Sequence, residues 1–279
     1  MTLAFSSVAL WSAAAFWAVV AAAGQLMFAF YVTSFYGRHA LAGDYAGWNK
    51  VMPHGYVAGD AWGNFAVGLH LALAVSIILA GFLQLIPALR QRYPQVHRWT
   101  GRVYVAVALL ISVDGLFMVW TRGAVGGLTQ HLSISLNAVV IMVCAVIALH
   151  HARARRFGEH RRWALRLFLA SGGVWFFRVG LMLWLIIHRT PVGFDPKTFQ
   201  GPFLTFLGLA QFLLPLAVLE LYLRAERSSP WGRLGHGRRL GDAHAGHGGG
   251  DRRGHDGYVA AASVIGPLQP SSRRDKIKS

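Results

Sequence analysis

Six stretches of this sequence are apolar over more residues than a helix or strand of a soluble protein needs. Apolar runs of about 18 residues or more are typical of membrane-spanning helices, because about 20 residues of helix cross the hydrocarbon core of a bilayer. Only 14% of the residues are charged, whereas about one quarter are charged in soluble domains. We therefore predict an all-α, polytopic membrane protein with six transmembrane helices in a bundle, at about residues 8–35, 64–89, 97–122, 130–151, 160–188 and 203–224.

The composition changes abruptly after the sixth apolar stretch. Residues 228–279 are rich in Arg, Gly, His, Ser and Pro, with one short apolar interruption. Such a segment buries too little apolar surface to offset the entropy lost on ordering. We predict a transmembrane domain over residues 1–227 and a disordered tail over residues 228–279.

The placement of the basic residues predicts the topology. Lys and Arg number four around the turn between the second and third apolar stretches, six at residues 153–166 and eleven from Arg224 onward, but only one in the loop after the third stretch. Positively charged loops face the cytoplasm in membrane proteins. We therefore expect both termini in the cytoplasm and the Arg-rich turns against anionic lipid headgroups. The net charge of +16 is explained in this way without a nucleic-acid partner.

Four histidines recur near the ends of four consecutive predicted helices. His70 precedes His97 by 27 residues, and His131 precedes His160 by 29 residues. In the predicted topology His70 and His131 lie near the outer face of the membrane, and His97 and His160 lie near the inner face. Neutral imidazoles are common ligands of metals and of haem iron. The four histidines are therefore candidate ligands.

Two charged residues interrupt the apolar stretches at the same predicted depth. Asp114 lies 17 residues beyond His97, and Arg178 lies 18 residues beyond His160. A charge in contact with lipid tails is costly, so intramembrane charges usually face the protein interior and pair with one another. We expect an ion pair between Asp114 and Arg178 on the inward faces of their helices.

The segments "HRWTGRVY" and "HRRWALR", within the six-helix layout, resemble a bacterial membrane-protein family known as domain of unknown function 2306. The likeness covers about residues 64–188 and implies a polytopic protein of the bacterial inner membrane, without implying a reaction. The layout is also similar to that of six-helix di-haem cytochromes b, in which helices 2 to 5 each supply one haem-ligating histidine. That resemblance implies a b-type haem between His70 and His131 and another between His97 and His160, with Arg178 available to a propionate.

Each of these residues also has a structural interpretation. His97 and His160, followed by Arg and Trp, are typical of anchors at the membrane edge, and His70 and His131 of hydrogen-bonding side chains between helices or at the interface. Asp114 and Arg178 suit a structural ion pair, a proton or substrate site, or contact with a haem propionate or a quinone. Gln25, Gln84 and Asn137 are typical of interhelical hydrogen bonds.

Two functions follow from these interpretations. The first is electron transfer across the membrane through b-type haem, and the alternative is a non-redox protein such as a small transporter or a lipid-interacting assembly protein. A single cysteine, Cys144, excludes an intramolecular disulfide and a thiolate metal cluster. The sequence contains no phosphate-binding loop, nucleophile elbow or zinc-protease motif, which argues against hydrolase or nucleotide chemistry of the soluble type. Whether the protein is an enzyme stays open.

Overall fold

The computed structural model describes residues 2–228. Over this range the chain is helical apart from its connecting loops and one isolated β-bridge between Asp195 and Gln200. Nearly all of the predicted tail lies outside the described residues, and the last helix continues to Ser228. The elements are α1 Thr2–Leu41, η1 Tyr45–Lys50, α2 Ala61–Leu85, α3 Pro87–Arg92, α4 Pro94–Arg122, α5 Gly127–Arg153, α6 Phe157–Ser171, α7 Gly173–His188 and α8 Pro202–Ser228.

These helices confirm the predicted fold class. Among the described residues, α1, α2, α4, α5 and α8 are each long and apolar enough to cross a membrane, and α6 with α7 forms a sixth span when the two are counted together. Large apolar side chains such as Phe30, Leu128 and Ile186 are more than 60% exposed on the outside of the bundle. An apolar outer surface of this kind is what a protein surrounded by lipid requires.

Four of the elements form the packed centre of the molecule. Core residues of α2, α4, α5 and α6 make one cluster, which includes Tyr104 and Leu167. Ala108, Ala145 and Ala170 of this cluster are fully buried, one on each of three helices. Small side chains at these positions let the helix backbones approach closely, as is usual in membrane bundles.

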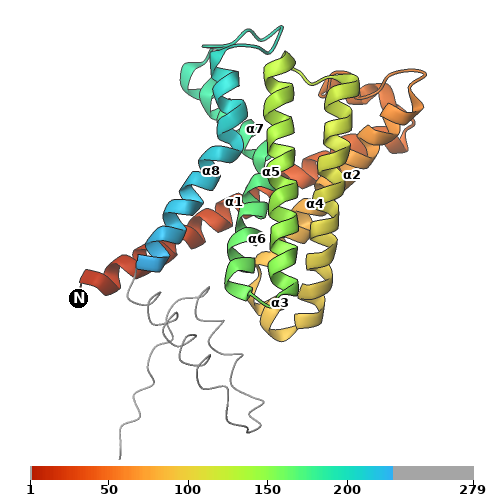
Figure 1. Cartoon of the computed structure of the whole chain (residues 1–279). Helices are drawn as coiled ribbons and strands as arrows, with labels where there is room; N and C mark the ends of the chain where they lie inside the picture. The colour runs from red at the N-terminus through yellow and green to blue at the C-terminus, as the bar shows by residue number, and fades with distance from the viewer. Residues whose placement is uncertain (1, 229–279) are drawn as a thin grey trace, which may run out of the picture.

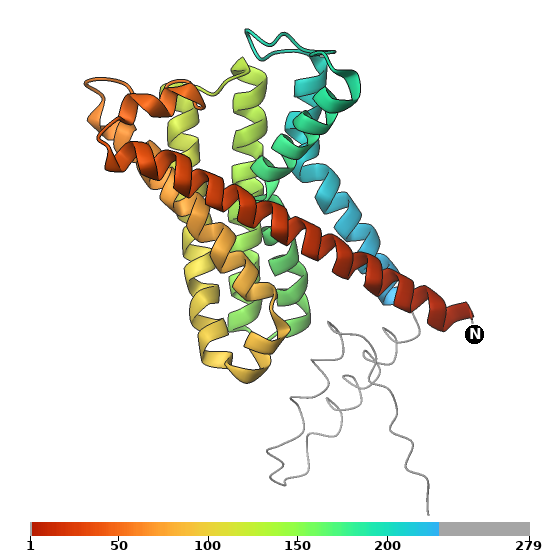
Figure 2. The same ribbon diagram turned by 180° about the vertical axis from the view of Figure 1, so that it is seen from behind.

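The remaining helices surround this four-helix centre. Figure 2 shows α1 crossing the bundle obliquely, and α1 packs on α2 and η1. Trp48 of η1 is buried, and its indole N–H donates to the carbonyl of Tyr36 in α1 at 3.2 Å. On the other side, α8 packs against α5, α6 and α7.

The two ends of the bundle differ in composition. The short helix α3 and the α5–α6 turn lie at the same end as the beginning of α1 and the end of α8 (Figure 1). We call this the arginine-rich end, because it carries Arg90, Arg92 and the arginines of residues 153–166. We call the opposite end, with η1 and the α4–α5 and α7–α8 connections, the loop end.

Candidate functional site

The span predicted at about residues 160–188 consists of two helices in the structure, with a break between them. The chain leaves α6 at Ser171, and α7 begins at Gly173 with a bend of 49° between the two axes. A Cβ atom on Gly173 would lie 2.8 Å from Nδ2 of Asn137, and one on Gly172 would lie 3.1 Å from Nε2 of Gln25. Two successive glycines therefore let polar side chains of α5 and α1 approach the bent backbone.

Asn137 of α5 makes the polar contact at this break. Its Nδ2 donates to the carbonyl oxygen of Ala170, in the last turn of α6, at 3.3 Å. The side chain is only 8% exposed, and its Oδ1 atom is buried without a hydrogen-bond partner among residues 2–228. Buried polar atoms nearly always have partners, so an unpaired amide oxygen here is a candidate for binding a ligand.

Further polar side chains extend from Asn137 toward the loop end, and we call Gln130, Ser133, Asn137 and Gln211 the polar track. The three residues on α5 are spaced by three and four positions, so they share one helix face. All four are buried. Ser133 Oγ and Gln211 Nε2 both donate to the carbonyl of Gly208 in α8, the second at 2.7 Å.

The polar track ends at a small open cavity. Gln130 donates through Nε2 to the carbonyl of Leu204 at 2.8 Å, and it also lines a cavity of about 140 Å³. Gly126, Phe199 and Gln200 complete part of its wall. Asn137 lies ten residues beyond the first residue of α5, which is roughly 15 Å along the helix. Because the hydrocarbon core of a bilayer is about 30 Å thick, this depth is near its middle.

Asp114 pairs with a different residue from the one predicted. Its Oδ2 lies 2.9 Å from Nδ1 of His70 in α2, and among the ion pairs of the described residues none joins Asp114 to Arg178. The guanidinium carbon of Arg178 instead lies 4.9 Å from the ring centre of Phe28. Equal depth did not ensure contact, because α4 turns Asp114 toward α2 while α7 packs mainly on α8.

The other predicted ligands also have protein partners. At the loop end, His131 Nε2 accepts a hydrogen bond from the N–H of Ala124 at 2.7 Å, in the connection that precedes its own helix. At the arginine-rich end, His160 Nδ1 lies 2.9 Å from the carbonyl oxygen of Ala148 and donates to it. His97 lies within electrostatic range of His160, and its Nδ1 is buried without a partner in the described part of the chain.

These contacts give no support for the two predicted haem groups between the four helices. Nε2, the usual ligating nitrogen of histidine, accepts a hydrogen bond from Ala124 in His131. The ring of His70 packs on α4, and its Cε1 atom lies 3.3 Å from the position that a Cβ atom would take on Gly115. Seven residues beyond His97 and His160, on the same helix faces, Tyr104 and Leu167 fill the core. Bis-histidine haem needs two facing imidazoles with a flat ring between them. The packing therefore does not support haem here.

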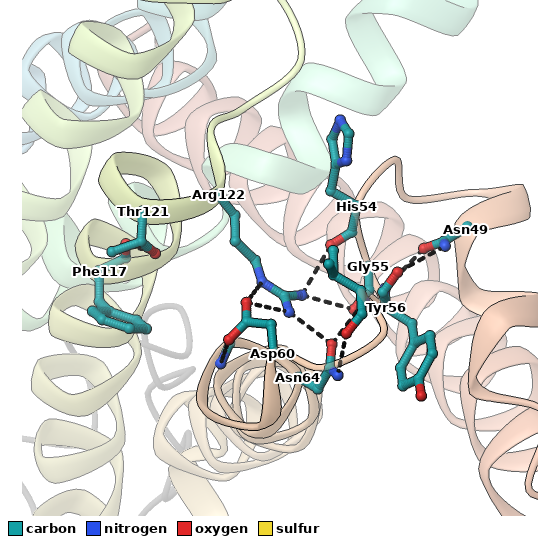
Figure 3. A network of polar contacts seen from close by, with 11 residues as sticks. Asn49, His54, Gly55, Tyr56, Asp60, Asn64, Phe117, Thr121 and Arg122 are labelled. Atoms are coloured by element: carbon teal, nitrogen blue, oxygen red, sulfur yellow. Dashed lines mark hydrogen bonds and ion pairs between the residues drawn. The ribbon is translucent and has the colours of Figure 1, made fainter.

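A polar network at the loop end was missed by the sequence analysis. Arg122, at the end of α4, donates to Asp60 Oδ2 from Nε at 3.0 Å and from Nη2 at 2.8 Å (Figure 3). Its Nη2 also donates to Asn64 Oδ1, and its Nη1 donates to the carbonyls of His54 and Gly55. All five N–H groups of the guanidinium are thus used. The network fastens the α1–α2 loop to α4 and leaves Arg122 no donor for a ligand.

Asp60 has a second role in this network as the N-cap of α2. Its Oδ1 accepts from the N–H of Gly63 at 2.9 Å. This hydrogen bond and, after it, the Arg122 guanidinium lower the pKa of the Asp60 carboxyl. An Asp immediately before an apolar helix is a recognisable capping signal, whereas the partner 62 residues away has no local signature.

The predicted interhelical hydrogen bonds of two amide side chains are present. Gln84 Nε2 donates to Thr100 Oγ1 at 2.6 Å and joins α2 to α4, while Asn137 joins α5 to α6. Gln130, Ser133 and Gln211 were not predicted from the sequence. The spacing of Gln130, Ser133 and Asn137 on one face of α5 was a signal that could have revealed part of the polar track.

Comparison with known families agrees with this architecture. The family model described as "Predicted membrane protein (DUF2306)" matches residues 67–213, which is more than half of the chain. The chain belongs to this family. The match runs from α2 to the middle of α8, so the DUF2306 segment contains the four-helix centre, the break and the whole polar track. No curated protein and no solved structure matches the chain.

Proposed function

We propose that the protein is a membrane carrier for a small, uncharged polar solute, bound at the break between α6 and α7. The observation that carries the proposal is the unpaired, buried Oδ1 of Asn137 beside a helix break at mid-membrane depth. Amide and hydroxyl groups line the polar track, and neutral hydrogen-bonding groups of this kind suit a solute without net charge.

The cost of irregular backbone inside a bilayer supports a functional role for the break between α6 and α7. Irregular backbone within the hydrocarbon region is costly unless other protein groups or a water-filled cavity satisfy it. Secondary transporters commonly use such broken helices to place their binding sites near the midplane. The cavity beside Gln130 lies at the loop end of the polar track, and this is where a solute would enter.

Ligand-dependent thermal stability tests the carrier proposal. The purified protein would be melted in detergent with a panel of polyols, sugars and small amides, and compounds that raise its Tm would be tested for uptake into proteoliposomes. We expect Asn137→Leu to abolish both responses. Gln84→Leu is the matched control, because it removes an interhelical amide that lies outside the polar track. A compound that stabilises Asn137→Leu as much as wild type does not bind at the break.

The orientation is part of the same proposal. The basic residues of the arginine-rich end support a cytoplasmic position for this end in a bacterial inner membrane, with anionic headgroups around it. The polar track would then open to the outside.

Electron transfer through b-type haem is the competing function, supported only by the six-span layout and the positions of the four histidines. The hydrogen bond of His131 and the filled core do not favour it. An absorption spectrum of protein purified from haem-replete cells distinguishes the two functions. A carrier gives no Soret band, whereas reducible Soret and α bands that require His70 or His97 would replace the carrier proposal with electron transfer.

A further inference from the structure

Three basic side chains from three different helices lie in one region of the arginine-rich end. His97 of α4 lies within electrostatic range of Arg90 of α3 and of His160 of α6. Arg90 in turn interacts with Arg161, which lies beside His160 in the sequence. Arg90 and Arg161 are both positively charged and repel one another, so their approach is costly unless an anion is close to them.

Two neighbouring arginines, both on α6, have carboxylate partners on α8. Arg161 donates to both carboxylate oxygens of Glu226, at 3.0 and 2.9 Å, and Arg166 pairs with Glu220. Arg90 has no carboxylate partner among residues 2–228, and its Nη2 atom is buried without a hydrogen bond. Burial and the nearby Arg161 lower the pKa of the Arg90 guanidinium, and an anion beside it would oppose that shift.

His97 also has a buried polar atom, Nδ1, without a hydrogen-bond partner in the described part of the chain. The Ala148 carbonyl accepts a hydrogen bond from Nδ1 of His160, so Nε2 of this ring donates to an anion when the ring is protonated. The arginine-rich end therefore holds buried polar atoms without partners among residues 2–228 on both Arg90 and His97.

The backbone adds positive potential to the same region. His97 and His160 each lie in the fourth position of a helix, α4 and α6, and neither helix has a side-chain N-cap hydrogen bond. The N-terminal end of a helix carries a partial positive charge and unpaired N–H groups, both of which favour anions.

We propose that Arg90, His97 and His160 bind a phosphate group at the arginine-rich end of the bundle. Guanidinium and imidazole donors suit phosphate oxygens, and a basic pocket between helix ends is a common site for phospholipid headgroups. The phosphate belongs either to an anionic lipid of the surrounding leaflet or to free phosphate, since both present the same oxygens. This site does not depend on the carrier proposal, because it lies at the opposite end of the bundle from the opening of the polar track.

Binding to purified protein in a non-ionic detergent tests this site. The probes are dihexanoyl phosphatidylglycerol, inorganic phosphate and, as a phosphate-free control, dihexanoylglycerol, each titrated while Tm is measured. We expect phosphatidylglycerol to raise the Tm of wild type and dihexanoylglycerol to leave it unchanged. Stabilisation by phosphatidylglycerol alone identifies a lipid headgroup as the ligand, and equal stabilisation by inorganic phosphate identifies the free ion.

The variants decide where the probe binds. Arg90→Gln and His97→Gln should each weaken binding at least about tenfold, as expected when one charge-assisted hydrogen bond is lost. Arg92→Gln is the matched control, because it removes an exposed arginine from the same short helix. Two variants are used so that the test survives if one of them fails to fold. The proposal is wrong if neither phosphate probe stabilises wild type, or if Arg92→Gln weakens binding as much as Arg90→Gln.

Discussion

At the residue scale, the partner of Asp114 is the most informative contact inside the membrane. A carboxylate within a span needs a hydrogen-bond donor, and His70 supplies it at 2.9 Å. The side chain of Asp114 is 10% exposed and that of His70 is 30% exposed, so the pair is largely shielded by protein. Arg178, stacked on Phe28, is outside this pair.

A double-mutant cycle measures this choice of partner. We expect His70→Ala and Asp114→Ala to couple by about 1 to 3 kcal/mol in the free energy of unfolding in detergent, because either change leaves the other group unpaired. Asp114→Ala and Arg178→Ala should be additive within about 0.5 kcal/mol. Strong coupling of Asp114 to Arg178, with none to His70, would restore the ion pair that equal depth suggested.

The Asp60 and Arg122 contact predicts an acid-sensitive loop. Since the pKa of folded Asp60 is below its unfolded value of about 3.9, its contribution to stability is present above that pH and is lost as pH falls through the folded pKa. We expect the protection of amides at residues 49–60, measured against the intrinsic exchange rate at each pH, to fall on acidification below about pH 4. In Arg122→Met this protection should already be low at neutral pH and should change less with pH. A loop that is equally protected in both proteins at pH 7 would show that the network does not hold it.

At the scale of the element, the break between α6 and α7 depends on glycine as a small residue. The hydropathy of this segment predicts one continuous span, since the residues on both sides of the break are apolar. The bend arises where Gly172 and Gly173 allow close approach of Gln25 and Asn137, so α7 leaves the four-helix centre and packs on α8.

Adding one methyl group at this position tests the element. Gly173→Ala places a carbon 2.8 Å from Asn137 Nδ2, and we expect it to cost about 1 to 3 kcal/mol in the free energy of unfolding. The double variant with Asn137→Ala should recover part of this loss. Gly37→Ala is the control, because no atom lies within 4 Å of its added carbon and alanine favours the helix. Equal effects at both glycines would show that contact with Asn137 is not the cause.

At the scale of the whole molecule, the distribution of arginines and the fold agree on which loops share an end. The α3 turn and the α5–α6 turn lie together with the beginning of α1 and the end of α8 (Figure 1). This agreement shows which loops lie together, and the positive-inside bias predicts which side of the membrane they face.

Reporter fusions test the assigned side. A fusion after Arg156 should report a cytoplasmic position, because six basic residues at 153–166 resist translocation. A fusion within residues 40–60 should report a periplasmic position. The same reporter fusions, made in a variant with Arg155 and Arg156 changed to Gln, serve as a control for the role of charge. The reverse pattern would invert the molecule and place the phosphate site and the opening of the polar track on the opposite sides from those proposed.

The sequence by itself determined that the chain is a helical membrane protein, where most of its spans lie and that Gln84 and Asn137 join helices. These properties depend on local hydropathy and on the cost of burying polar groups, both of which can be evaluated residue by residue. Only the tertiary structure decided that Asp114 contacts His70, that Arg122 fastens a loop 62 residues away and that Gly173 lies against Asn137. Each of those depends on how helices rotate and pack side by side, and depth along a helix does not specify its rotation.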